Sequence, residues 1–192
     1  MGYLHKFLVG GAMNLGQLII ISISLSMDAF SLAIIYGTLG LDKKMTNLLS
    51  AMVGSFHFFM PILGNLIGLF LLESFLPNPD LLVGIIFTIL ASEMLLSLKD
   101  LDARKIKITS FYQALLFAFS VSIDSFSVGI GLGIHEENTV LCGLLFSIFS
   151  FLFTKIGLDC GKRLTIRFGK IANIFGSIIL LILGIKYLLI SF

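Results

Sequence analysis

The sequence predicts an all-α integral membrane protein whose six transmembrane helices form two inverted-topology repeats of three helices. Three observations predict it. Of the 192 residues, 57% are hydrophobic and only 12% are charged, whereas a soluble domain is usually about 25% charged. The apolar residues gather in six segments, each long enough to supply the roughly 17–25 residues that cross a bilayer. One motif of fourteen residues occurs twice, with an offset of 96 residues.

The six apolar segments are continuous rather than alternating, which favours helices. They span approximately 15–36, 47–72, 81–98, 111–134, 140–158 and 171–189. We divide the chain into a short N-terminal extension (1–14), a first three-helix repeat (15–98), a basic cytoplasmic linker (99–110) and a second three-helix repeat (111–192). A start of translation at Met13 instead of Met1 is an open alternative.

The basic residues are distributed asymmetrically among the loops. The first, third and fifth loops contain ten Lys or Arg, and the second and fourth contain none. The positive-inside rule therefore predicts that the basic loops are cytoplasmic and that both termini lie outside. Because each half has an odd number of spans, the second half enters the membrane from the opposite side, as in the inverted repeats of secondary transporters.

The repeated motif places one aspartate in the middle of each long apolar run. Its copies are Ser24–Gly37 and Ser120–Gly133, which share seven of fourteen residues. A carboxylate near the middle of a bilayer costs at least ~2.5–3.5 kcal/mol on insertion scales and usually faces a cavity. Asp28 and Asp124 are therefore candidate cation ligands. Ser31 and Ser127, three residues later, share a helix face with them. In the structural alternative, the aspartates only join helices by hydrogen bonds.

The second and third segments contain two further candidates. His57 lies four residues before Pro61, and a proline at this position displaces the carbonyl of residue 57 and kinks the helix. His57 is either a cation ligand or proton acceptor, or a histidine hydrogen-bonded within the bundle, and its counterpart in the second half is about Ser150. Glu93 is a secondary candidate ligand, or an acid that snorkels to the cytoplasmic interface.

Small residues predict close helix contacts. The GxxxG motif Gly64–Gly68 recurs as Gly157–Gly161 at an offset of 93 residues, so a matched helix contact is expected in the two halves. We assign Gly37, Gly133 and Pro61 to helix packing and gating. The two cysteines, Cys142 and Cys160, flank one predicted helix about 27 Å apart and cannot form a disulfide with each other.

The two aspartate motifs resemble those of the MntP family of manganese efflux pumps. The matching residues are Ser26-Met27-Asp28-Ala29-Phe30, Ser122-Ile123-Asp124-Ser125, Val128-Gly129-Ile130-Gly131 and Pro61-Ile62-Leu63-Gly64. The resemblance covers Met13–Phe192 and implies six helices, a bacterial cell membrane location, and Mn²⁺ moved out of the cytoplasm. It also implies that Asp28, Asp124 and Gly37 are functional positions.

The chain departs from the family pattern in two places. His57 stands where many members have a glutamate, and Ala91-Ser92 replaces a glycine pair. The second motif is also similar to that of the related YtaF-type sporulation membrane proteins.

The expected function is secondary-active, proton-coupled export of a divalent cation, and Mn²⁺ is the substrate that ranks first. Asp28 and Asp124 would face each other across the pseudo-twofold axis and bind the ion with Ser31, Ser127 and His57. Mn²⁺ is then the substrate, no cofactor is expected, and the protein is not an enzyme.

The expected partners are the metal ion and the lipid bilayer, with a homo-oligomer left open. Nucleic acid is not expected because the net charge is only +2. Three alternatives remain: transport of another cation such as Ca²⁺, Cd²⁺ or a small organic cation; a non-transporting scaffold, for example in sporulation; and an intramembrane aspartyl protease. The protease ranks last because the glycines follow Asp124 instead of preceding it as GxGD.

Overall fold

The computed structural model describes residues 15–75, 79–98, 110–134, 138–161 and 166–191. The expected N-terminal extension (1–14) and residues 99–109 of the expected linker lie outside the described residues. Every regular element in these ranges is an α-helix, which confirms the all-α class.

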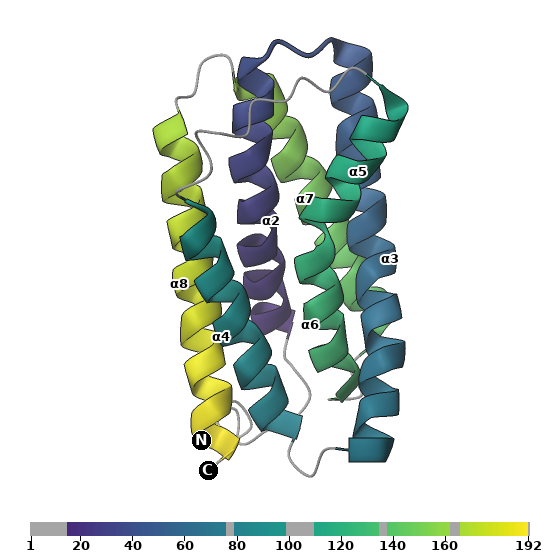
Figure 1. Ribbon diagram of the computed structural model, residues 1–192, viewed down its shortest axis with the longest axis vertical. Coiled ribbons are helices and arrows are strands. Elements are labelled where there is room, and N and C mark those ends of the chain that lie inside the picture. The colour runs from purple at the N-terminus through teal and green to yellow at the C-terminus, as the bar shows by residue number, and fades with distance from the viewer. Residues whose placement is uncertain (1–14, 76–78, 99–109, 135–137, 162–165, 192) are drawn as a thin grey trace.

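The helices form one elongated bundle (Figure 1). They are α2 (Leu15–Thr38), α3 (Lys43–Phe75), α4 (Pro79–Ser97), α5 (Phe111–Val121), α6 (Ile123–Ile134), α7 (Thr139–Cys160) and α8 (Ile166–Ser191). Helices α2, α4 and α7 run in one direction, and α3, α5–α6 and α8 run in the other, so the start of α2 and the end of α8 share one end of the bundle (Figure 1). The most extensive packing joins α2 with α7, α3 with α6 and α7, and α4 with α8.

The bundle suits a lipid environment. Within the described residues, five stretches are long and apolar enough to cross a membrane: α2, the first 26 residues of α3, α5–α6 taken together, α7 and α8. The apolar part of α4 described in the structure, Val83–Leu96, is shorter, so the sixth span remains a prediction. Large apolar side chains are exposed on the outer surface, among them Leu66, Phe70 and Leu189. Since water would disfavour such a surface, the chain is a multi-pass membrane protein.

The expected helix over 111–134 is not continuous, because Ser122 separates α5 from α6. The Ser122 N–H donates to the carbonyl of Phe119, three residues back, at 3.1 Å. The Ser122 hydroxyl donates instead to the carbonyl of Ala118 at 2.8 Å. A serine side chain can substitute in this way for a helical backbone hydrogen bond. The interruption places Asp124 in the first turn of α6.

The duplicated glycine pairs make matched contacts, as predicted. A Cβ atom added to Gly64 would lie 2.1 Å from the carbonyl oxygen of Phe126, and one added to Gly157 would lie 2.9 Å from that of Phe30. Phe30 and Phe126 occupy the same position in the two motif copies. Each GxxxG therefore packs against the aspartate-bearing helix of the other half of the chain.

The second glycine of each pair repeats the contact one turn further on. A Cβ added to Gly68 would lie 2.2 Å from the carbonyl oxygen of Ile130, and one added to Gly161 would lie 2.5 Å from that of Ile34. The Cβ at Gly161 would also lie 2.7 Å from the Cα of Gly37, so α2 and α7 approach there backbone to backbone. Gly133 lies within α6.

Two buried apolar clusters fill the bundle, one toward each end. On α2 the first cluster ends at Leu25 and the second begins at Ala29. On α5–α6, the last residue of the second cluster is Val121, and the first cluster begins again at Val128. Buried and half-buried polar residues occupy the gap, and we call them the polar layer: Ser26, Asp28, His57, Ser122, Asp124, Ser150 and Asn173.

Candidate cation site

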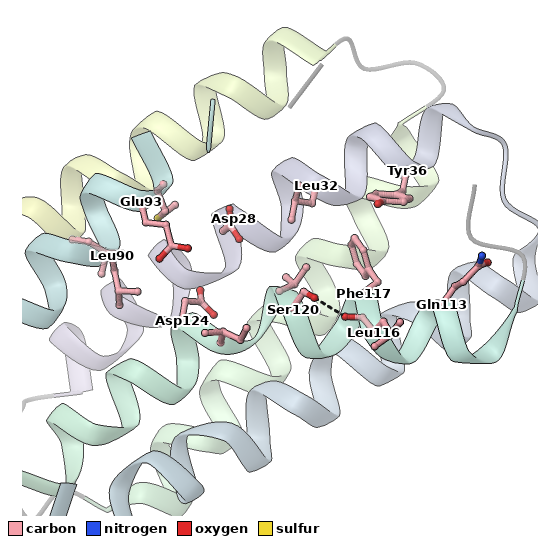
Figure 2. A pocket seen from close by; sticks show the side chains of 14 residues that line it. Asp28, Leu32, Tyr36, Leu90, Glu93, Gln113, Leu116, Phe117, Ser120 and Asp124 are labelled. Atoms are coloured by element: carbon pink, nitrogen blue, oxygen red, sulfur yellow. Dashed lines mark hydrogen bonds between the residues drawn. The ribbon is translucent and has the colours of Figure 1, made fainter. Parts of the chain in front are cut away.

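A cavity of about 500 Å³ opens between α2, α4, α5–α6 and α8. Asp28, Glu93 and Asp124 lie close together at one end of it, and Tyr36 and Gln113 lie at the other (Figure 2). The three carboxylates come from three different helices. Among the described residues, the lining includes no Lys or Arg, so no basic side chain of the lining offsets the negative charge of the carboxylates when they are ionised. The carboxylate end of the cavity therefore favours a cation.

Asp28 is half-buried near the middle of α2. Its Oδ1 accepts a hydrogen bond from Nδ2 of Asn173 at 3.2 Å, and Asn173 is completely buried on α8. Sequence reasoning missed Asn173. The available signal was an amide side chain inside the predicted apolar segment 171–189, where a polar group needs a specific partner.

Asp124 is held at the N-terminus of α6. Its Oδ1 accepts from the backbone N–H of Ser125 at 2.6 Å, and free backbone N–H groups at a helix N-terminus favour a negative charge. Its Oδ2 is buried and has no hydrogen-bond partner among the described residues. One carboxylate oxygen is thus fixed by the protein, and the other is available to a cation.

His57 lies completely buried on α3. Its Nδ1 is 2.9 Å from the carbonyl oxygen of Val53 and 2.8 Å from the hydroxyl of Ser122. Because a carbonyl only accepts, we assign the proton to Nδ1. Nε2, which is 3.9 Å from Asp124 Oδ1, then carries a lone pair. His57 does not line the cavity, so its role as a direct ligand remains a prediction.

The two halves of the chain differ at the position of His57, whose counterpart in the second half is Ser150, and both residues lie in the polar layer. The Ser26 and Ser150 hydroxyls lie 3.2 Å apart, and Ser26 corresponds to Ser122 in the repeated motif. The Ser26–Ser150 pair is thus the counterpart of the Ser122–His57 pair. The same interhelical contact is made by a serine in one half and by an imidazole in the other.

The other predicted residues lie outside the cavity lining. Ser31 is completely buried where α2 meets α8, and a Cβ added to Gly169 would lie 3.5 Å from its hydroxyl oxygen. The Ser127 hydroxyl donates to the Ile123 carbonyl at 3.3 Å. Pro61 packs against α6, where a Cβ added to Gly129 would lie 2.4 Å from its carbonyl oxygen. The ligand roles of the two serines and the gating role of Pro61 remain predictions.

In this conformation the acidic side chains are near one another but are not arranged as a closed metal site. Within the described ranges, no group of three or more His, Cys, Asp or Glu side chains could hold a metal ion. Figure 2 shows the carboxylates of Asp28, Glu93 and Asp124 directed toward a common space instead. A cation entering this space would have to draw them together.

Comparison with known proteins identifies the family. Residues 40–188 match the family described as "Putative manganese efflux pump". A relative from Geobacillus thermodenitrificans is 35% identical over 177 residues, covering 91% of this chain and 97% of the relative. Relatives from Bacillus thuringiensis and Bacillus cereus are 37% identical over 177 residues, covering 90% of this chain and 94% of each relative. All three relatives are named "Putative manganese efflux pump MntP".

No solved structure matches the chain. The family consists of transporters rather than enzymes. Together with the membrane-spanning bundle and the acidic cavity, these matches show that the chain belongs to the MntP family of manganese efflux pumps.

Proposed function

We propose that this protein exports Mn²⁺ from the cytoplasm by secondary-active transport through a site built on Asp28 and Asp124. The observation that carries the proposal is the gathering of Asp28, Glu93 and Asp124 at one end of a cavity inside an apolar bundle. Carboxylate oxygens suit Mn²⁺, and the scarcity of thiols disfavours Cu⁺. The names of the relatives support the same substrate.

Charge balance explains why two aspartates would be needed. Two carboxylates neutralise one Mn²⁺, so the loaded site can be enclosed in an apolar bundle without an uncompensated charge. Glu93 is exposed on α4, and we assign it to the first encounter with the ion. Binding would then draw Asp28 and Asp124 together around the ion and close the cavity.

The position of the cavity supports loading from the cytoplasm. It reaches from the carboxylates to Tyr36 in the last turns of α2 and Gln113 in the first turn of α5. Lys43 is the first residue of α3, and Arg167 is the second residue of α8; both helices begin at this end of the bundle. The positive-inside rule assigns the basic end to the cytoplasm, which leaves both termini outside the bacterial plasma membrane.

The matched contacts support an inverted repeat with six spans. The glycine pairs Gly64–Gly68 and Gly157–Gly161 pack on equivalent residues of the opposite half, and the helices of the two halves run in opposite directions (Figure 1). In such repeats the substrate site lies at the interface of the halves, and access alternates when one half rocks against the other. The polar layer, between two apolar clusters, is then the midplane of the transporter.

Proton exchange is the natural driving force for this site. After Mn²⁺ leaves, Asp28 and Asp124 can return in their protonated forms, which restores electroneutrality. Nε2 of His57, 3.9 Å from Asp124 Oδ1, is a base next to this carboxylate and can accept its proton.

The test is to measure Mn²⁺ export for the wild type, Asp28→Asn and Asp124→Asn in a bacterial strain lacking its own exporter. Intracellular metals are measured by mass spectrometry after growth in excess Mn²⁺. Each isosteric variant removes a charge, so we expect it to lower the export rate on the order of 100-fold. Ser55→Ala is the matched control, because the Ser55 hydroxyl is exposed and already bonded to Ala51 of its own helix.

The outcomes separate the alternatives. If both Asn variants export Mn²⁺ like the wild type, the aspartate site is wrong. A wild type that lowers another metal instead of Mn²⁺ would favour a different cation as the substrate. A wild type that changes no metal would favour a scaffold.

A further inference from the structure

Several polar atoms of the polar layer and its surroundings are buried without a hydrogen-bond partner among the described residues. They are Asp124 Oδ2, His57 Nε2, Ser31 Oγ and Asn173 Oδ1. An unpaired buried polar atom destabilises a fold and usually indicates a missing ligand, ion or water. The first two belong to the site on Asp124, but the last two lie on the other side of the site, where α2 meets α8.

Asn173 has the geometry of a second ligand next to Asp28. Its side chain is fully buried, and its Nδ2 donates to Asp28 Oδ1 at 3.2 Å while its Oδ1 has no partner among the described residues. Gly169 lies one turn earlier on α8, against Ser31. The α2–α8 contact thus joins the Asp28 carboxylate to the buried Asn173 amide, and the buried Ser31 hydroxyl lies about one turn further along the same contact.

An amide differs from the other groups of the layer because it can present either a donor or an acceptor at nearly the same position. When Asp28 is ionised and empty, the Asn173 NH₂ group satisfies it. When a cation binds to Asp28, the carboxylate charge is met by the ion, and a donor pointing at that ion is repelled. A half-turn about the Cβ–Cγ bond exchanges Nδ2 for Oδ1 and places a neutral oxygen toward the cation.

We propose that Asn173 is a substrate-binding residue whose amide holds Asp28 in the empty site and ligates the transported cation through Oδ1 in the loaded site. This inference rests on the proposed export of Mn²⁺. A neutral ligand strengthens binding without disturbing the charge balance between two carboxylates and one Mn²⁺. The site is then asymmetric, with an amide on the side of Asp28 and an imidazole on the side of Asp124.

The ligand type predicts a selectivity. An amide oxygen is a hard ligand that suits Mn²⁺, Mg²⁺ and Ca²⁺, whereas a thiolate favours softer ions such as Cd²⁺ and Zn²⁺. Asn173→Cys would therefore replace a hard ligand by a soft one of smaller size. A residue with only a structural role gives no reason for the preferred metal to change.

The experiment measures Mn²⁺ and Cd²⁺ transport by the full chain in proteoliposomes, as KM and maximal rate. Asn173→Cys is compared with Ser177→Cys, which adds a thiol one turn further on α8, where the native hydroxyl is bonded to the Ile174 carbonyl. We expect Asn173→Cys to raise the ratio of Cd²⁺ to Mn²⁺ transport efficiency on the order of tenfold, and Ser177→Cys to leave it unchanged. Asn173→Leu, of similar size without polar atoms, should raise the KM for Mn²⁺ by a similar factor.

The results separate this inference from the proposed function. If the wild type transports Mn²⁺ and Asn173→Cys keeps the wild-type metal ratio, Asn173 is not a ligand. A wild type that transports neither ion contradicts the proposed function, and the inference falls with it. If Asn173→Leu does not fold, the comparison of the two cysteine variants still decides.

Discussion

The contact between Gly64 and α6 predicts that Gly64→Ala will force apart two helices that carry the site. An added Cβ would lie 2.1 Å from the carbonyl oxygen of Phe126 and 2.9 Å from the backbone nitrogen of Ile130. Both are main-chain atoms of α6, so no side-chain rotation relieves the clash. Because a relaxed C···O contact is about 3.3–3.6 Å, the helices must separate by more than about 1 Å.

The magnitude follows from the size of that movement. Inserting a methyl group into a tightly packed contact costs about 1–3 kcal/mol, and a shift of backbone against backbone belongs at the upper end. At about 2–4 °C per kcal/mol for a chain of this size, we expect the melting temperature to fall by roughly 6–12 °C. Asp124 precedes Phe126 by two residues, so Mn²⁺ export should fall too.

The assay is thermal unfolding of the purified protein in detergent, followed by circular dichroism. Gly131→Ala is the matched control, because Gly131 is also in α6 but its added Cβ would meet only side-chain atoms of Val83, the nearest at 3.3 Å. Both substitutions change helix propensity alike, so their difference reports the contact. If the two variants melt within about 2 °C of each other, the close approach of α3 and α6 is wrong.

Three further predictions concern other parts of the bundle. Ser150→Ala removes the bond to Ser26 and should lower the free energy of unfolding by only about 0.6 kcal/mol, with Mn²⁺ export retained. His57→Ser should instead abolish the dependence of Mn²⁺ uptake by inside-out vesicles on an imposed pH gradient. Equal pH responses of the two variants would contradict the proton role of His57. Cys160 is partly exposed at the basic end of α7, and Cys142 is buried. Under the proposed orientation, a membrane-impermeant maleimide should label Cys160 only after the cells are permeabilised, and it should not label Cys142. Labelling of Cys160 in intact cells would reverse the orientation. Lys155→Met, which removes contacts with Asn47 and Asp159, should change stability by at most about 1 kcal/mol, and a larger loss on chemical unfolding would show a structural role.

Much of the fold could be predicted from composition and repetition, because a bilayer imposes strong length and polarity rules on each helix. The first span was predicted to end at residue 36 and α2 ends at Thr38. The second was predicted to begin at residue 47, but α3 begins at Lys43, since helical hydrogen bonding continues past the apolar segment. The interruption at Ser122 could not be predicted from hydropathy, because it consists of one backbone bond, from the Ser122 N–H to the carbonyl of Phe119 three residues back.

The site was predicted only in part for similar reasons. Repetition drew attention to Asp28 and Asp124, which both line the cavity. Ser31 lies only three residues after Asp28, yet it is completely buried where α2 meets α8 and does not line the cavity. Spacing along one helix could not predict this, because it depends on how α8 packs against α2. Asn173 has no copy in the first half and belongs to no motif, so only the three-dimensional contact with Asp28 draws attention to it.

The apolar cluster beyond the carboxylates, on the side away from Tyr36 and Gln113, has an electrical consequence. It contains Phe87, Phe146 and Leu25, all almost completely buried. A doubly charged ion gains or loses about 4.6 kcal/mol for each 100 mV of membrane potential that it crosses, so an open path would let Mn²⁺ flow back into the cell down that potential. Under the proposed function, the packed cluster would close this path on the side of the carboxylates opposite to the cavity. It would then prevent ions from leaking across the membrane while the site is loaded.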